Sequence, residues 1–356
     1  MNIRALKYAL PLTLYVLAMI SFSSHGIYCW LLLLFGWVLI PLMELLMKRN
    51  IRNLSLAEEE MAKKDKMYDL LLYLSVLLLY PTLFVFLHSM QEHGLAISDR
   101  IARVATMGMV CGTIGINVGH ELGHRSSRFE QMLGKASLLS SLYTHFFIEH
   151  NKGHHKNVAT RNDPSSARLG ESVYRFYPRT IILTYISAWR IAGQEARKNN
   201  RSTLGLHNEM LQLQLVQLGL ILLIFFVFGW KMLLYYLAVA FMGALLLETV
   251  NYIEHYGLSR KKLADGKFER AMPRHSWNSD HPIGRLLLFE LSRHSDHHYL
   301  ASRKYQLLRH HEEAPELPTG YPGMMLLSLF PPIWFFVMHR QMEKYKSLLS
   351  EPPVKL

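Results

Sequence analysis

The amino-acid sequence predicts an all-α integral membrane protein with six transmembrane helices and a cytoplasmic helical cap that holds a histidine-rich metal site. Three observations lead to this prediction: long uncharged apolar segments, Lys and Arg residues gathered between them, and short histidine clusters next to them. Half of the 356 residues are hydrophobic (50%). They lie in long runs, which is typical of membrane helices rather than of a soluble core.

A helix needs about 20 apolar residues to cross a hydrocarbon layer about 30 Å thick. Six segments are predicted to do so: 8–22, 27–47, 69–90, 102–119, 212–229 and 232–253. The first follows a positively charged start, as a secretory signal would, but no small-residue cleavage pattern comes after it. We therefore expect the first two segments to form a retained helical hairpin. Segments 178–195 and 324–338 are too short to span and are expected at the interface or against the bundle.

The placement of Lys and Arg predicts the orientation. Every basic segment falls on one side of the membrane if both termini are cytoplasmic. We expect one domain over residues 1–356, in which two cytoplasmic blocks, 123–211 and 254–356, meet in space. The net charge of +12 then reflects topology and attraction to anionic membrane lipid. No motif supports a nucleic-acid partner.

Nine histidines fall into four short clusters, HELGH, EHNKGHH, NYIEHYG and RHSDHH. They are His120, His124, His150, His154, His155, His255, His294, His297 and His298. Neutral imidazole is a good ligand for iron, zinc, copper or nickel. Nine imidazoles exceed what one ion can use and suit two ions with room for a substrate such as dioxygen. The clusters therefore favour an oxidative metalloenzyme.

Helical spacing places the members of each cluster on a common face. His120 and His124 are four residues apart, and the same spacing joins His150 to His154. The three histidines of the last cluster, spaced i, i+3 and i+4, would also gather on one side of a helix. His255 stands alone, and by spacing it could be a structural residue instead.

Two other readings of the histidines remain open. HELGH matches the zinc-protease pattern H-E-x-x-H, with Glu121 as the general base. That reading leaves seven further clustered histidines unexplained. A non-catalytic metal-binding or haem-binding membrane protein is the other alternative. One zinc would support the protease, and two irons would support oxygen chemistry.

Carboxylates accompany each histidine cluster. The candidates to support the ligands are Glu121, Glu149, Glu254 and Asp296. A metal-bound imidazole commonly donates its second N–H to a carboxylate, which fixes its tautomer. Soluble di-iron bundles also use carboxylates as direct ligands, so either role is open. Three further acids lie nearby in the sequence: Asp163, Asp280 and Glu290.

The chain offers no obvious electron carrier of its own. Its two cysteines, Cys29 and Cys111, lie in predicted spans, and no CxxC pair is present. Electrons for an oxidative reaction would come from outside. The basic residues around the last cluster are the predicted docking site for an acidic donor, with lipid headgroups as the alternative partner. They are Arg293, Arg303, Lys304 and Arg309.

The histidine strings resemble the histidine boxes of the integral-membrane di-iron enzymes, which include fatty-acid desaturases and hydroxylases. NVGHELGHR, NYIEHYGL and LSRHSDHHYLASRKYQLLR are most similar to one branch, the membrane alkane 1-monooxygenases and xylene monooxygenases. The resemblance implies that all nine histidines, His255 included, hold two irons. The chain departs from it at Arg274, where such relatives often have a further histidine. Before residue 69 only hydrophobicity and the PLME turn match.

The resemblance also implies a reaction and its partners. It implies O2-dependent hydroxylation of medium- or long-chain linear alkanes to 1-alcohols, with electrons from rubredoxin or a ferredoxin-type donor and its reductase. A xylene-type methyl monooxygenase or a fatty-acyl hydroxylase or desaturase are the alternatives. The implied location is a bacterial-type inner (cytoplasmic) membrane, with the active site in the cytoplasm. An alkane binds by apolar burial, about 0.8 kcal/mol per CH2, so we expect a channel lined by residues such as Phe35, Trp37, Phe84 and Phe86.

Overall fold

The computed structural model describes residues 3–350, and side chains for residues 4–345. Its regular elements are helices, joined by loops that contain two isolated β-bridges. Within this range six helical segments are long and apolar enough to cross a membrane, as predicted. They are Arg4–Ser23, Gly26–Leu46, Met67–Ser89, Ile97–Gly123, Glu209–Phe228 and Trp230–His255. The fourth span is longer than expected at both ends, and the other boundaries shift by a few residues.

Three of the spans are built from several helical pieces. The first contains α1 (Ile3–Leu6), η1 (Lys7–Ala9) and α2 (Leu12–Ser23); the second contains η2 (Gly26–Trp30), α3 (Leu31–Leu34), η3 (Phe35–Leu39) and α4 (Ile40–Leu46). The fourth contains α7 (Ile97–Val110), η4 (Cys111–Ile116) and α8 (Asn117–Gly123). The others are α6 (Met67–Ser89), α13 (Glu209–Phe228) and α14 (Trp230–His255). Both η3 and η4 are wide π-helical turns, a distortion that is frequent near functional sites.

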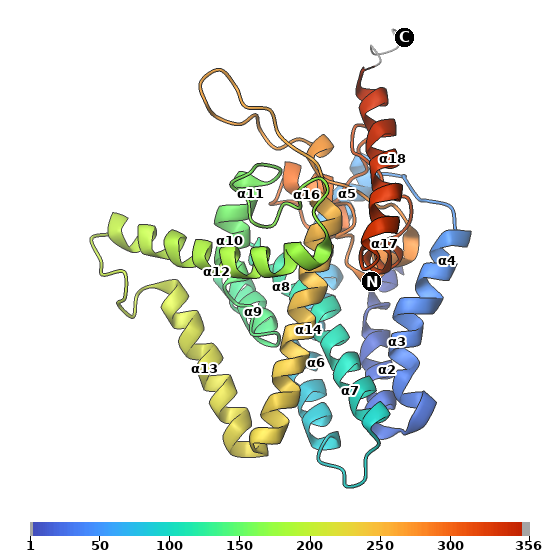
Figure 1. Ribbon diagram of the computed structural model, residues 1–356, viewed down its shortest axis with the longest axis vertical. Helices are drawn as coiled ribbons and strands as arrows, with labels where there is room; N and C mark the ends of the chain where they lie inside the picture. The colour runs from blue at the N-terminus through green and yellow to red at the C-terminus, as the bar shows by residue number, and fades with distance from the viewer. Residues whose placement is uncertain (1–2, 351–356) are drawn as a thin grey trace.

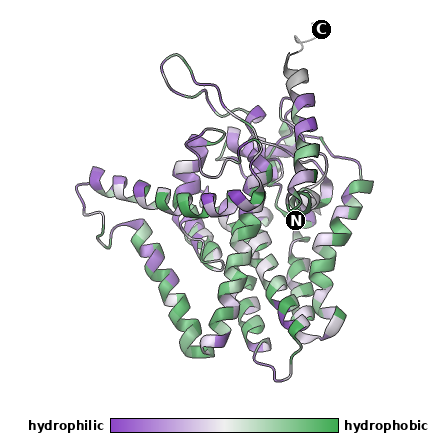
Figure 2. Ribbon diagram, viewed as in Figure 1, coloured by the Kyte–Doolittle hydropathy of each residue, from purple (hydrophilic) through white to green (hydrophobic). Residues whose placement is uncertain are grey.

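The helices outside the spans lie mostly in a cap at one end of the bundle, except that α9 packs beside α6 and α8 (Figure 1). They are α5 (Leu56–Lys64), α9 (Arg128–Leu139), α10 (Phe146–Glu149), η5 (His150–His154), α11 (His155–Asn157), α12 (Val173–Lys198), η6 (Pro273–His275), α15 (Pro282–Leu287), α16 (His294–Tyr299), η7 (Tyr305–Leu307), α17 (Tyr321–Ser328) and α18 (Pro331–Ser350). Figure 2 shows that the cap is mostly hydrophilic and that the opposite end of the bundle is mostly hydrophobic. This division is what a membrane-embedded bundle with one water-facing end requires.

The structure also places the two apolar segments that were too short to span, 178–195 and 324–338, in helices outside the six spans. Helix α12 is longer than the predicted segment 178–195 and crosses the direction of the spans (Figure 1). The predicted segment 324–338 is divided between α17 and α18, and Pro331 begins α18, where its missing N–H costs nothing. Trp334 of α18 is buried against Tyr252 and Tyr256 of α14, with ring centroids 5.2 Å apart in each pair.

Residues 123–211 and the described part of the second polar block, residues 254–350, are in contact. The amide of Gly257 donates to the carbonyl of Ala167 over 3.0 Å, and the amide of Arg260 donates to the carbonyl of Ala159 over 2.8 Å. The first described residues also reach the cap, since Arg4 donates to Glu58 of α5 over 2.7 Å. The predicted position of the termini themselves concerns residues 1–2 and 351–356, which lie outside the described range.

Candidate metal centre

Four segments of the chain bring the nine predicted histidines together in the cap. The end of α8, the turn from η5 into α11, the last residue of α14 and the short helix α16 each contribute some of them. Their ring nitrogens form two groups, each with all ligand atoms within 4.8 Å of one another. The five-histidine group is His120, His124, His150, His155 and His297; the four-histidine group is His154, His255, His294 and His298.

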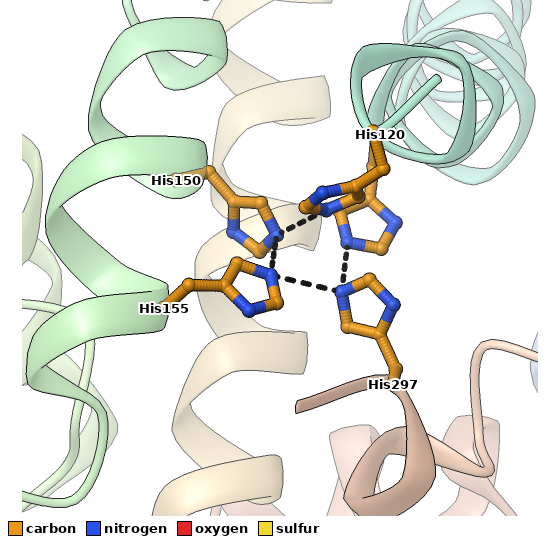
Figure 3. Close-up of side chains that lie close together, drawn as sticks. His120, His150, His155 and His297 are labelled. Carbon is orange, nitrogen blue, oxygen red and sulfur yellow. Dashed lines mark hydrogen bonds between the residues drawn. The ribbon is translucent and has the colours of Figure 1, made fainter. Parts of the chain in front are cut away.

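The five-histidine group is held by a chain of close nitrogen contacts, four of whose members are labelled in Figure 3. The Nε2 atoms of His120 and His297 are 3.0 Å apart, and those of His297 and His155 are 3.1 Å apart. The chain continues from His155 to His150 over 3.0 Å and from His150 to His124 over 3.1 Å. All of these contacts use Nε2, so every ring points the same atom at the centre of the group.

The four-histidine group has the same organisation. The Nε2 atom of His298 lies 3.2 Å from that of His154 and 2.9 Å from that of His294. His294 in turn lies 3.2 Å from Nε2 of His255. His255 is therefore part of a group, although its spacing in the sequence did not indicate one. The nine residues are buried or half-buried.

The local backbone decides which histidine joins which group. His120 and His124 share a group, as their four-residue spacing predicts. His150 and His154 also lie side by side, with ring centroids 5.1 Å apart, but η5 is a π-helical turn in which residues five apart align. It pairs His150 with His155 and sends His154 to the other group.

Helix α16 was predicted to gather its three histidines on one side. It turns them all toward the centre but divides them between the groups. His294 and His298, four residues apart, belong to the four-histidine group, whereas His297 belongs to the five-histidine group. One helical turn of α16 therefore borders both groups, which places them side by side.

The chemistry of these contacts fits metal ions. A neutral imidazole offers either one N–H or one lone pair at Nε2, so it can satisfy only one partner there. His150, His155 and His297 each meet two other Nε2 atoms. Two nitrogens that each bind one ion at about 2.0–2.1 Å lie close to 3 Å apart. A cation in each group satisfies the convergent lone pairs, and protons alone do not.

Burial keeps most of these rings in the form that binds metal. Desolvation, followed by the neighbouring histidines, lowers the pKa of His150, His297 and His298 well below its usual range. These rings are therefore neutral at pH 7. His154 differs: burial lowers its pKa, but the Asp163 carboxylate outweighs burial and the pKa is raised.

Two carboxylates contact the four-histidine group directly. Asp163 Oδ2 lies 2.9 Å from Nδ1 of His154, where it can accept the second N–H and fix the tautomer of the ring. Glu254 Oε2 lies 3.2 Å from Nε2 of His294, on the metal-facing side, while its Oε1 accepts from Tyr321 over 2.9 Å. The sequence analysis predicted Glu254 as a carboxylate that supports the ligands, and it gave Asp163 only as a further acid nearby in the sequence.

Of the other three predicted carboxylates, Glu121 and Asp296 make contacts of a different kind. Glu121 accepts from Arg125 over 2.7 Å and from the amide of Tyr305 over 3.2 Å, so it supports the packing around α8. Asp296 binds Arg303 at 2.7 Å and His311 at 2.7 Å, neither of which belongs to a histidine group. Burial, followed by the nearby Asp163, raises the pKa of Glu149 to about 8.

The four basic residues expected to receive an electron donor are all ion-paired in the structure. Arg293 is 2% exposed and donates to Asp280 over 2.9 Å, so its assignment to a docking surface is wrong. Arg309 makes two 2.7 Å bonds to Glu59, and Lys304 binds Asp69 over 2.7 Å. Arg303 binds Asp296, as described above. These side chains hold the cap together.

An apolar cavity leads from within the spans to the histidines. Its lining runs from Trp37, Ile40 and Met109 to His120, His150 and His294. Of the aromatic residues predicted to line a channel, only Trp37 does so; Phe86 is buried in the core, and Phe84 is 59% exposed.

One polar side chain in this cavity was missed by the sequence analysis. Asn117 lies one turn before His120 on α8, is 6% exposed, and its Nδ2 has no hydrogen-bond partner among the described residues. A buried donor left unpaired is costly and indicates a place for a polar group. Its position i−3 to His120 is the signal that could have identified it.

The fold and the site together define a class: multi-pass membrane enzymes with histidine-box metal centres. The sequence pattern of the fatty acid desaturase family matches residues 100–328. Alkane 1-monooxygenase of Pseudomonas putida is 39% identical over 88% of this chain and 77% of its own length. Alkane 1-monooxygenase 1 of Pseudomonas aeruginosa is 43% identical over 69% of this chain and 64% of its own length, slightly less than two thirds. The xylene/toluene monooxygenase hydroxylase component of Pseudomonas putida is 27% identical over 65% of this chain.

The chain therefore belongs to the alkane 1-monooxygenase family, within the wider fatty acid desaturase family. It is an oxidoreductase of the monooxygenase type. The family assignment and the gathering of all nine histidines replace the zinc-protease alternative, and Glu121 of HELGH is bonded to Arg125 and the amide of Tyr305.

Proposed function

We propose that this protein hydroxylates the terminal methyl group of medium- or long-chain linear alkanes and yields 1-alcohols. The apolar cavity that ends at the histidines carries the proposal. An alkane has no polar handle, so its binding energy comes from burial at about 0.8 kcal/mol per CH2. A cavity lined mostly by apolar residues of the spans is the right environment for such a molecule, and His120, His150 and His294 are part of the same lining.

We propose that the nine histidines bind two irons, one in each group, and that Asp163 and Glu254 support the four-histidine group. When bound, the iron pair supplies the activation of O2 and the oxidation of the C–H bond. The reaction joins one oxygen atom of O2 to the substrate carbon and releases the other as water, which consumes two electrons and two protons. A xylene-type methyl group would fit the same scheme, and the similarity to the xylene/toluene enzyme makes it the second candidate.

The chain's own residues determine where the substrate is oxidised. Secondary C–H bonds are weaker than primary ones, so selectivity for the terminal methyl has to come from positioning. The side chains of Trp37, Ile40 and Met109 contribute to the apolar lining of the cavity, and His120 and His294 line it as well. An extended alkane that enters lengthwise presents its methyl group to the histidines first.

We further propose that residues 1–356 act as one domain in the inner membrane, with the cap in the cytoplasm. The basic loops between spans support this orientation. An external donor such as rubredoxin with its reductase, or a ferredoxin-type protein, would provide the electrons.

Product analysis with octane tests the proposed function. The protein in membranes, supplied with O2 and a chemical reductant, should form 1-octanol as the main product. Val250→Phe, which narrows the cavity, should lower turnover of hexadecane more than that of octane. Val104→Phe, at a half-buried position of α7 that lines a different pocket, is the matched control and should change the turnover of neither alkane. A dominant 2- or 3-octanol would refute the lengthwise cavity, and an alkene from an acyl substrate would favour a desaturase.

A further inference from the structure

We infer that a basic groove behind His154 is the docking surface for an acidic electron-transfer protein. The inference rests on the proposed function, because that reaction consumes two electrons per turnover. The groove, with a volume of about 1270 Å³, lies between two loops of the cap. It is a different surface from the ion-paired residues around α16.

Both walls of the groove continue directly from segments that carry the histidines. One wall is the loop after α11, residues 159–169, and the other is the segment after α14, residues 257–268. Arg260 fixes the walls to each other: its Nη2 donates to the carbonyl of Lys156 over 2.6 Å and its Nη1 to the carbonyl of Glu269 over 3.1 Å. The second wall includes the orange segment that projects from the cap in Figure 1.

One residue that lines the groove is linked to the four-histidine group by hydrogen bonds. Ser166 lines the groove and donates from Oγ to Oδ2 of Asp163 over 2.5 Å. The same oxygen of Asp163 lies 2.9 Å from Nδ1 of His154. A carrier seated in the groove is therefore separated from His154 by two side chains linked by hydrogen bonds. Such a short bonded path is what an electron-entry point needs.

The charges on the rim indicate the chemistry of the partner. Arg161, Arg168 and Lys262 are exposed and form no ion pair among the described residues. The acidic side chains nearby are already neutralised: Glu171 by Arg179, Asp265 by Lys267 and Glu269 by Arg274. Three exposed cations outside any ion pair attract an acidic protein surface and raise its association rate.

Lipid headgroups are the less favourable partner for these cations. The groove is part of the hydrophilic cap, and its second wall projects away from the apolar part of the bundle (Figure 2). A basic surface that binds anionic lipid has to lie within about a Debye length of the membrane.

The test reverses the three charges. Arg161→Glu, Arg168→Glu and Lys262→Glu are combined in one variant of the full chain in nanodiscs of neutral lipid, and reduced rubredoxin is the probe. The association rate and the rubredoxin-driven kcat/KM should fall by about tenfold or more at low salt, and their dependence on ionic strength should flatten. Turnover of octane with a small chemical reductant should stay unchanged, because the histidine groups are intact.

A matched variant controls for charge alone. Arg197→Glu, Lys198→Glu and Arg201→Glu change the same number of exposed basic residues at the far end of α12 and should leave rubredoxin binding unchanged. Unchanged binding in the groove variant, or equal loss in both variants, would overturn the inference. Loss of binding to anionic vesicles with unchanged rubredoxin kinetics would identify a lipid contact instead. If the unmodified protein forms no 1-octanol with the chemical reductant, the proposed function itself fails.

Discussion

The two histidine groups share helix α16 and the turn at η5, yet their surroundings differ. The four-histidine group is fully buried and has two carboxylates against its rings, Asp163 at His154 and Glu254 at His294. In the five-histidine group no ring is in hydrogen-bond or ion-pair contact with a carboxylate of the described chain, and His124 and His155 are only half-buried. His150 instead stacks on Phe146 with ring centroids 4.6 Å apart.

If each group holds one of the two proposed ions, the two ions have unlike environments. Five neutral imidazoles can complete a coordination sphere without a charged ligand. Four imidazoles leave room for a fifth donor, and Glu254 lies where such a donor would be. A carboxylate also offsets the charge of a buried cation, which low-dielectric surroundings make costly. We therefore expect the four-histidine group to depend on its acids and the five-histidine group to depend on its rings alone.

Loss of one histidine from either group should have the largest effect. His155→Ala and His298→Ala should each reduce turnover below detection, because a missing ligand opens the coordination sphere. Iron content should fall from about two to about one per chain, since each variant keeps the other group intact. Both proteins should still insert in the membrane, because the spans are unchanged. Near-normal turnover in either variant would mean that the groups are misassigned.

Glu254→Gln tests most directly whether the four-histidine group, unlike the five-histidine group, depends on a carboxylate ligand. If the carboxylate is the fifth donor of the four-histidine group, this variant should lose about one iron per chain, as His298→Ala does. Metal analysis with turnover of octane would show it. Tyr321→Phe removes only the 2.9 Å bond to the other oxygen of Glu254 and is the matched control, with a smaller loss expected. Full iron content in Glu254→Gln would show that Glu254 only supports the ligands.

Asp163→Asn should have an intermediate effect. Asn can still accept from Nδ1 of His154 but carries no charge, and losses of this kind lower metal affinity or activity by roughly 10- to 100-fold. Iron titration of the metal-free protein measures it. The loss should be confined to one of two irons. A loss of both would show that the groups are coupled and would weaken the distinction between them.

Glu121→Gln should have the smallest effect, although Glu121 lies between two ligands in the sequence. Its partners are Arg125 and the amide of Tyr305, neither of which is a predicted metal ligand. Loss of a carboxylate that orients a metal ligand lowers activity by roughly tenfold or more. We therefore expect Glu121→Gln to lower turnover by less than about tenfold. Thermal unfolding should show the greater change, because a buried ion pair is lost. Complete loss of iron in this variant would contradict the contacts described above.

The sequence by itself determined the six spans, the polar cap and the nine histidines. These features follow from local rules: an apolar run of sufficient length has to be a helix in lipid, because its backbone groups find no other partner. Clustered imidazoles next to such runs then indicate metal. The resemblance supplied His255, which local spacing left open.

Only the tertiary structure decided how the histidines divide and which acids serve them. His120 meets His297 across 177 positions of sequence, and His154 meets Asp163 because the loop after α11 folds back. The π-turn at η5, which pairs His150 with His155, replaces the spacing expected of a regular helix. The burial of Arg293 likewise depends on contacts with distant segments. Such pairings depend on how the segments of the cap pack against one another and against the bundle. The spacing of residues within one segment does not predict that packing.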